Sequence, residues 1–212
     1  MITGILPAVL FIIVCLRAVE KRLTKKRGFL SKIHRPASAA LIVVSILHII
    51  LTFPVLNMRP ILIPLTGTLC LLAIFAACSF AAIRKMKLHR YSAVCSALFF
   101  VLHIVFNITA IHDYHNQVRA IEFSQIDIVN IPDGIYTGEC DVSFISATVA
   151  VTVQSGMMTD IRLLEHKHDR GQSAEAIIDK LLERQTIEVD AVAGATNSST
   201  VIKKAVENAL KP

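Results

Sequence analysis

Two apolar stretches of the chain carry histidines at matching positions. Lys32-Ile33-His34-Arg35 is repeated as Lys87-Leu88-His89-Arg90, and in each stretch a second histidine follows 14 residues later, at His48 and His103. In a helix, 14 residues fall about 40° short of four turns, so both histidines share one face, about 21 Å apart. Histidine is a common axial ligand of haem iron. The spacing therefore favours two bis-histidine haems, His34/His89 and His48/His103.

The chain contains no Cys-x-x-Cys-His motif, so any haem would be of b type, held by ligation alone. The intrahelical spacing resembles that of four-helix cytochromes and ferric-reductase-type membrane domains, which implies two haems stacked across a membrane. The alternative is that these histidines only make packing hydrogen bonds. Two pairs in register favour ligation, because an ionisable group at membrane depth is costly and tends to be functional.

The elements that must position these histidines are apolar helices. The chain has 212 residues, of which 54% are hydrophobic, and its mean hydropathy of +0.59 is typical of a membrane protein. Four runs have about the length that crosses a bilayer: Ile2–Ala18, Pro36–Leu56, Ile61–Ile83 and Tyr91–Ile111. The second and fourth helices would cross the membrane in the same direction, so the two histidines of each pair would lie at the same depth in the membrane. We predict a helical domain over residues 1–111.

Charge divides the chain near residue 112. Residues 1–111 contain 13 Lys and Arg but one acidic residue, Glu20, whereas residues 112–212 contain nine basic and 15 acidic residues. The basic residues cluster in loops 17–35 and 84–90, beside apolar runs, which favours a membrane surface over a nucleic acid as their partner. By the positive-inside rule these loops are cytoplasmic, so both termini of this multi-pass protein lie outside the cytoplasm.

A second motif lies near the C-terminus. Asp190-Ala191-Val192-Ala193-Gly194-Ala195-Thr196 resembles the attachment motif of the FMN-binding domain family, which includes flavin subunits of sodium-pumping quinone reductases. The resemblance implies that a flavin transferase joins FMN through its phosphate to Thr196. In the resemblance, Asp190 matches the acidic residue that opens the family's motif. Gly194 and Ala195 have no side chain that would obstruct the flavin or the transferase at Thr196. Ala193 departs from the family, which more often has Ser or Thr there.

A helix is predicted directly after this motif, over Ser199–Leu210, from its apolar residues at helical spacing. Asn197, Ser198 and Ser199 are residue types that favour helix N-caps. The Thr196 hydroxyl and Ser198 would therefore lie at the positive end of the helix, which stabilises a phosphate by about 0.3–1 kcal/mol.

The resemblance covers residues 133–210 and opens with Asp133–Gly138. Within it, Ser146–Val153 alternates as a half-buried strand, Gln154-Ser155-Gly156 forms a turn, and Met157–Glu165 pairs back as a hairpin. A further helix is expected over Ala174–Gln185. We expect the FMN-binding domain to span residues 133–212 and residues 112–132 to form a connector that packs on it.

Four more histidines belong to this half. The segment Glu165-His166-Lys167 resembles one that lies near the flavin in the family, which implies a hydrogen bond from His166 to the isoalloxazine ring. His168 is expected to face solvent. His112 and His115 read as part of a solvated helix end, because their spacing gives an incomplete metal site.

These observations predict a membrane all-α four-helix bundle followed by a small extracytoplasmic α+β FMN-binding domain. The function they favour is electron transfer, as a component of an oxidoreductase. Electrons would pass between a cytoplasmic or membrane donor, two b-type haems and a covalent FMN. The FMN would then pass them to an external or quinone acceptor. Two alternatives remain open. One is a haem-free, membrane-anchored flavin subunit of a larger redox complex, and the other is a non-catalytic FMN-binding sensor or assembly module.

Overall fold

The computed structural model describes residues 2–24 and 28–211 of the chain. Three of the basic residues used to predict the orientation, Lys25, Lys26 and Arg27, lie outside the described residues. The chain divides into two compact units, Met1–Asn107 and Ile108–Pro212, and each is described by itself.

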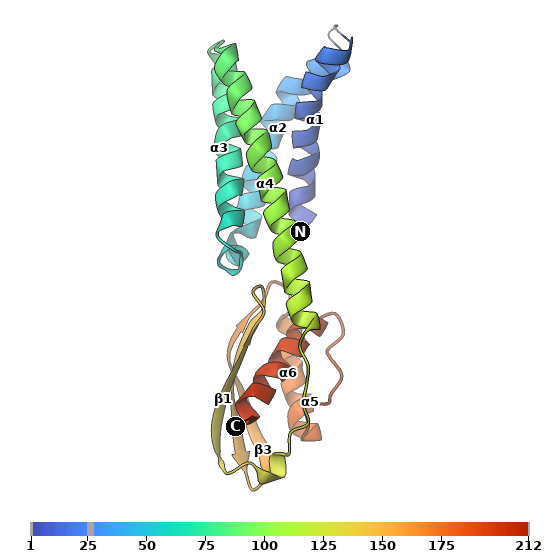
Figure 1. Cartoon of the computed structure of the whole chain (residues 1–212), viewed down its shortest axis with the longest axis vertical. Coiled ribbons are helices and arrows are strands. Elements are labelled where there is room, and N and C mark those ends of the chain that lie inside the picture. The colour runs from blue at the N-terminus through green and yellow to red at the C-terminus, as the bar shows by residue number, and fades with distance from the viewer. Residues whose placement is uncertain (1, 25–27, 212) are drawn as a thin grey trace. The chain divides into compact units, whose positions relative to one another are not determined.

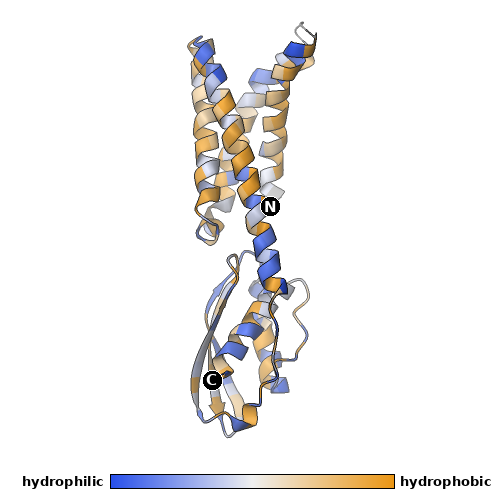
Figure 2. Cartoon of the chain, viewed as in Figure 1, coloured by the Kyte–Doolittle hydropathy of each residue, from blue (hydrophilic) through white to orange (hydrophobic). Residues whose placement is uncertain are grey.

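The first unit is helical (Figure 1). Its long helices are α1 (Ile5–Thr24), α2 (Phe29–Thr52), α3 (Leu62–Ala82) and α4 (Met86–Arg119), with short 3-10 turns η1 (Ile2–Gly4) and η2 (Phe53–Met58). Three segments are long and apolar enough to cross a membrane, namely Phe29–Met58, Leu62–Ala82 and Met86–Arg119. Hydrophobic residues cover most of these helices (Figure 2). The protein is therefore a membrane protein, as predicted.

Helix α1 does not meet the same criterion among the described residues. Its second half contains Arg17, Glu20, Lys21 and Arg22, and charged groups are costly within a bilayer. A membrane crossing by α1, and with it the count of four spans, stays a prediction.

An apolar layer fills the middle of the helical unit. The rings of Phe11 and Phe100 are stacked, with centroids 4.4 Å apart and an interplanar angle of 22°. Leu41, Cys70 and Ile74 are buried in the same cluster. Leu41 stands midway between the two histidines of α2 in the sequence, so this layer separates two histidine levels.

The second unit packs helices on one face of a three-stranded sheet (Figure 1). The strands β1 (Gly134–Asp141), β2 (Ser146–Gln154) and β3 (Met157–Lys167) are antiparallel and lie in the order β1-β2-β3. The helices are α5 (Ile177–Arg184) and α6 (Thr196–Leu210), with 3-10 turns η3 (Ile128–Asn130) and η4 (Gln172–Ala176). This confirms the predicted small α+β domain.

The alternation predicted in β2 places its valines in the core. Val149, Val151 and Val153 are fully buried, beneath Val201 and Ile202 of α6, which belong to the same cluster. Ser155 and Gly156 both have positive φ, 52° and 72°, as the tight turn of a β2–β3 hairpin requires. The predicted hairpin is therefore confirmed.

Gly138 allows α6 to lie directly against β1. A Cβ atom at this position would fall on the backbone of Ala205 and Ala209. We expect Gly138→Ala to lower the free energy of unfolding of the second unit by about 1–3 kcal/mol, because neither backbone can move aside without disturbing the core. Chemical denaturation of the detergent-solubilised chain, followed by circular dichroism, measures this.

Gly134→Ala is the matched control in the same strand, since a Cβ there meets only the Tyr136 ring at 3.4 Å. Equal stability of the two variants would contradict the proposed close approach of helix and strand.

The connector is fastened to α6 by a buried carboxylate, as the predicted packing requires. Glu207 has no exposed side-chain area and forms ion pairs with Lys211 at 2.6 Å and Lys204 at 3.1 Å. The Ser124 amide donates a hydrogen bond to Glu207 Oε1 at 3.1 Å. Ile121, Ile126 and other apolar connector residues pack on the same core.

These contacts predict a pH dependence. Burial by itself raises the pKa of Glu207, but the two lysines and the Ser124 amide outweigh it, and the pKa lies below its ordinary value of 4.5. Glu207 therefore contributes its full stabilisation above pH 4.5, its ordinary pKa. This stabilisation is lost as the pH falls through the lower pKa of the folded state. Denaturation midpoints measured from neutral to acid pH should fall more steeply for the native chain than for Glu207→Gln. Parallel curves would show that Glu207 is not the responsible group.

Candidate functional site

The start of α6 presents an exposed hydroxyl at a helix N-terminus. Thr196 is the first residue of the helix and is exposed. Ala195 occupies the N-cap position, and no side chain caps the helix by a hydrogen bond. The first backbone amides of a helix have no partner within it, and together with the helix dipole they favour a negatively charged group.

The loop before Thr196 is held in place by the helix itself. Ser199 Oγ accepts a hydrogen bond from the Val192 amide at 3.1 Å, and Lys203 Nζ donates to the Val189 carbonyl at 2.8 Å. The Ala195 amide closes a turn onto the Val192 carbonyl at 3.0 Å. The site is thus positioned by side chains one turn and two turns along α6.

Part of the sequence interpretation is wrong here. Asn197, Ser198 and Ser199 do not form the N-cap, because the helix begins at Thr196 and these residues occupy its first turn. Ser198 is only 2% exposed and packs against Gly171, where a Cβ atom would fall on its hydroxyl. Its predicted contact with a phosphate stays a prediction.

The loop just before this helix is open at Gly194. Gly194 has a φ of 79°, and a Cβ built on it would meet nothing within 4 Å, so the space beside Thr196 is unobstructed as predicted. Asp190 is exposed six residues before Thr196, where a modifying enzyme can reach it. A separate surface depression of about 570 Å³, lined by residues such as Glu122, Cys140 and Lys204, does not include Thr196. We assign the site on the chemistry of the helix end rather than on concavity.

His166 turns inward. Its side chain is 3% exposed, and Nδ1 lies 3.0 Å from Glu175 Oε1. The predicted hydrogen bond from His166 to an isoalloxazine ring stays a prediction. The expectation that His168 faces solvent is wrong, since its ring is half-buried with its centroid 4.4 Å from that of His166.

The side chain of His112 is 72% exposed, as expected for a solvated segment, although α4 continues past it to Arg119.

In the helical unit the structure brings the predicted histidine pairs together. The rings of His34 and His89 have centroids 6.4 Å apart and an interplanar angle of 86°. Two metal–nitrogen bonds of about 2 Å, plus roughly 1 Å from each nitrogen to its ring centre, place two axial imidazole centroids about 6 Å apart. The observed separation therefore matches that of two ligands on one iron. His48 and His103 also lie close enough to interact electrostatically.

Backbone carbonyls of α3 fix the two histidines of α4. His89 Nδ1 donates to the Ala77 carbonyl at 2.9 Å, and His103 Nδ1 donates to the Ile63 carbonyl at 3.0 Å. Because a carbonyl only accepts, the proton must be on Nδ1 in both rings. The Nε2 lone pair of each is then the one available to a metal. No side-chain pattern in the sequence indicates these carbonyls.

Two glycines leave room beside the second pair. A Cβ atom at Gly67 would lie 3.0 Å from His103 Cε1, and one at Gly4 would lie 3.5 Å from His48 Cε1. In the first pair, His34 Nδ1 is buried without a hydrogen-bond partner among the described residues. The ring separation of the first pair and the glycines beside the second pair are compatible with a b-type haem, and at each level the donors are two imidazoles.

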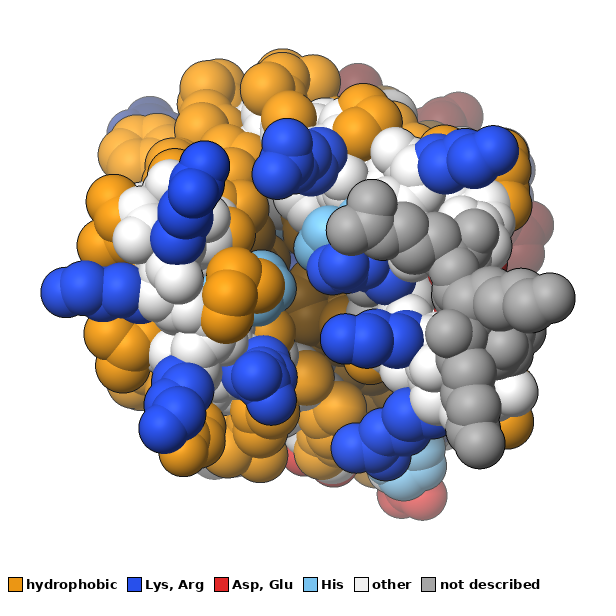
Figure 3. All heavy atoms as spheres, turned by 90° about the horizontal axis from the view of Figure 1, so that it is seen from above, with side chains coloured by type: hydrophobic (Ala, Val, Ile, Leu, Met, Phe, Trp, Pro, Cys, Tyr) orange, Lys and Arg blue, Asp and Glu red, His pale blue; other side chains and the backbone are white. Residues whose placement is uncertain are grey.

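The His34/His89 level lies toward the end of the helical unit that carries both basic loops. Viewed onto this end, Lys and Arg side chains surround a central hollow bordered by histidine side chains (Figure 3). The loops 17–35 and 84–90 thus share one end of the unit, as the positive-inside interpretation requires. Cationic groups at this position suit haem propionates.

Comparison with known proteins gives a match within the second unit. Residues 144–211 match the family model described as FMN-binding domain. This confirms the predicted resemblance over most of its length, while residues 133–143 precede the match. Neither the curated proteins nor the solved structures give a match to the chain. The resemblance of the helical unit to haem-binding membrane domains stays a prediction.

Proposed function

We propose that the FMN-binding domain of residues 144–211 holds its FMN covalently, as a phosphoester of Thr196 Oγ1. The observation that carries this proposal is the position of Thr196, exposed as the first residue of α6 without a side-chain cap. The adjacent amides stabilise the remaining negative charge of a phosphodiester. A flavin transferase is the partner that this maturation requires. When bound, FMN supplies the electron-carrying chemistry, and the protein holds and orients it.

The second part of the proposal assigns two b-type haems to the helical unit. His34 and His89 would hold one, and His48 and His103 the other. The support is the ring separation of 6.4 Å in the first pair and the Nδ1 hydrogen bonds of His89 and His103, which leave the lone pair of each ring on Nε2.

Together these cofactors make the chain an electron-transfer protein of the cell membrane. We infer that it passes electrons between a cytoplasmic or membrane donor and an external or quinone acceptor, with FMN outside the cytoplasm. The placement outside rests on the charge of loops 17–35 and 84–90. The histidine levels supply intermediate positions for the electron, so that no single transfer has to cross the whole bilayer.

One observation favours a haem-free flavin subunit as the second candidate. His48 Nδ1 and Thr3 Oγ1 form a hydrogen bond at 3.1 Å, and Asn107 Nδ2 lies 3.4 Å from His103 Nε2. Such contacts also satisfy histidines whose role is only packing.

An optical spectrum and an intact mass of the membrane-extracted protein, produced together with a flavin transferase, distinguish the candidates. The proposal expects a b-type Soret band and a mass increased by one FMN less one water. A flavin mass without a Soret band would support the second candidate, and an unmodified, colourless protein would contradict both.

A further inference from the structure

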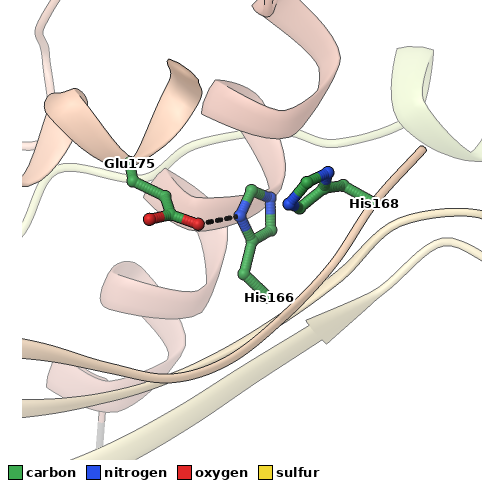
Figure 4. Close-up of side chains that lie close together, drawn as sticks. All are labelled: His166, His168 and Glu175. Carbon is green, nitrogen blue, oxygen red and sulfur yellow. Dashed lines mark hydrogen bonds and ion pairs between the residues drawn. The ribbon is translucent and has the colours of Figure 1, made fainter. Parts of the chain in front are cut away.

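Three potential ligands meet at the end of β3. His166 is the penultimate residue of the strand, His168 follows it, and Glu175 lies in η4. One ligand atom from each lies within 4.8 Å of the others. The side chains converge from the strand end and from η4 (Figure 4). Neither the phosphoester proposed at Thr196 nor the proposed haems use this cluster.

The hydrogen bonds fix where the proton of His166 lies. Glu175 Oε1 is 3.0 Å from His166 Nδ1, so Nδ1 carries the proton and Nε2 keeps its lone pair. His166 Nε2 is buried and has no hydrogen-bond partner among the described residues. An unpartnered polar atom in a side chain that is 3% exposed is costly, and the free edge of the ring points toward His168 (Figure 4).

His168 offers a second lone pair beside it. The Gly171 amide donates to His168 Nδ1 at 3.2 Å, so the neutral ring has its lone pair on Nδ1. Binding a metal at Nδ1 would exchange one long hydrogen bond for a metal–nitrogen bond.

We propose that His166 Nε2 and His168 Nδ1 bind one divalent first-row transition-metal ion, with Glu175 holding His166 in the required orientation. A carboxylate that accepts the other N–H of a ligating histidine is the usual support of such ligands. Imidazole nitrogens select Zn²⁺, Cu²⁺ or Ni²⁺ over Mg²⁺ and Ca²⁺, which prefer oxygen. The remaining coordination positions are left to water or an external ligand.

The geometry needs little adjustment. One ligand atom from each of the three residues already lies within 4.8 Å of the others. Two metal–nitrogen bonds of about 2 Å at a tetrahedral angle need ligand atoms about 3.3 Å apart, so the two imidazoles have to move closer together. The loop that would move ends at Gly171, which packs on Ser198 in the first turn of α6. The metal is therefore close to the flavin-bearing helix without being part of the flavin attachment.

Zinc uptake tests the proposal. The full-length, detergent-solubilised protein, with its cofactors as isolated, is dialysed against buffered Zn²⁺ in excess Mg²⁺, and zinc per chain is measured by elemental analysis. We expect the native chain to hold one zinc more than His168→Ala. Glu175→Gln should bind that zinc about 10–100-fold more weakly, because His166 loses its orienting carboxylate.

His115→Ala is the matched control, since His115 is an exposed histidine of the same unit outside the cluster and should leave zinc uptake unchanged. Circular dichroism of each variant checks that the second unit remains folded. If folded His168→Ala takes up as much zinc as the native chain, the cluster binds no metal and the two imidazoles share only a proton. Zinc is counted independently of flavin and haem, so this result leaves the proposed function untouched.

Discussion

Replacing Thr196 by alanine is expected to abolish covalent flavin incorporation. The variant removes the only atom through which the proposed phosphoester can form and leaves the backbone of α6 intact. Intact mass of the protein produced with a flavin transferase should then equal that of the bare chain. Thr196→Ser, which keeps a hydroxyl at the first position of the helix, should retain modification.

Thr200→Ala provides the matched control one turn further along the same helix. The Thr200 hydroxyl donates to the Thr196 carbonyl at 3.0 Å, so this variant removes a threonine hydroxyl and a local contact but not the attachment atom. It should keep the flavin mass. Retention of the flavin by Thr196→Ala, or its loss from Thr200→Ala, would place the attachment elsewhere.

The second large effect is expected at His103. His103→Ala should halve the haem content, because a bis-histidine iron that loses one of its two ligands is no longer held by ligation from both helices. The reduced α-band and the iron per chain, measured on the solubilised protein, report this loss. The His34/His89 level lies beyond the apolar layer and should keep its haem.

His112→Ala is the control for this change, because His112 lies on the same helix with its side chain 72% exposed and belongs to neither pair. Full haem content in His103→Ala, or a native protein without iron, would exclude the proposed ligation and leave these histidines a packing role.

Pattern and composition predicted most of the fold. The alternating valines of β2 indicated which face is buried, and Ser155-Gly156 indicated the hairpin, because both signals are local. The helices were found for the same reason. The end of α4 was missed because residues 112–119 are mostly polar but contain no Gly or Pro, so hydropathy no longer marks the helix although no residue breaks it.

The site was predicted less completely, since its determinants are tertiary. Ser198 and Ser199 looked like capping residues, yet Ser199 Oγ holds the Val192 amide and Ser198 is buried against Gly171. The carbonyls of Ala77 and Ile63 that fix the α4 histidines have no side-chain signature at all. The approach of His168 to His166 depends on the path of a loop after β3, which residue spacing does not determine.

The stacked Phe11 and Phe100 rings bear on how the membrane potential acts on this protein. The buried residues of their cluster, Phe11, Leu41, Cys70 and Ile74, carry no carboxylate, amine or imidazole, so these side chains offer no relay for a proton. An electron that moves between the two histidine levels would then cross without a compensating proton. Such a movement of charge is electrogenic, and for a charge that crosses the full membrane the free energy is about 2.3 kcal/mol per 100 mV of membrane potential. The direction of net flow would therefore respond to the energised state of the membrane as well as to the potentials of donor and acceptor.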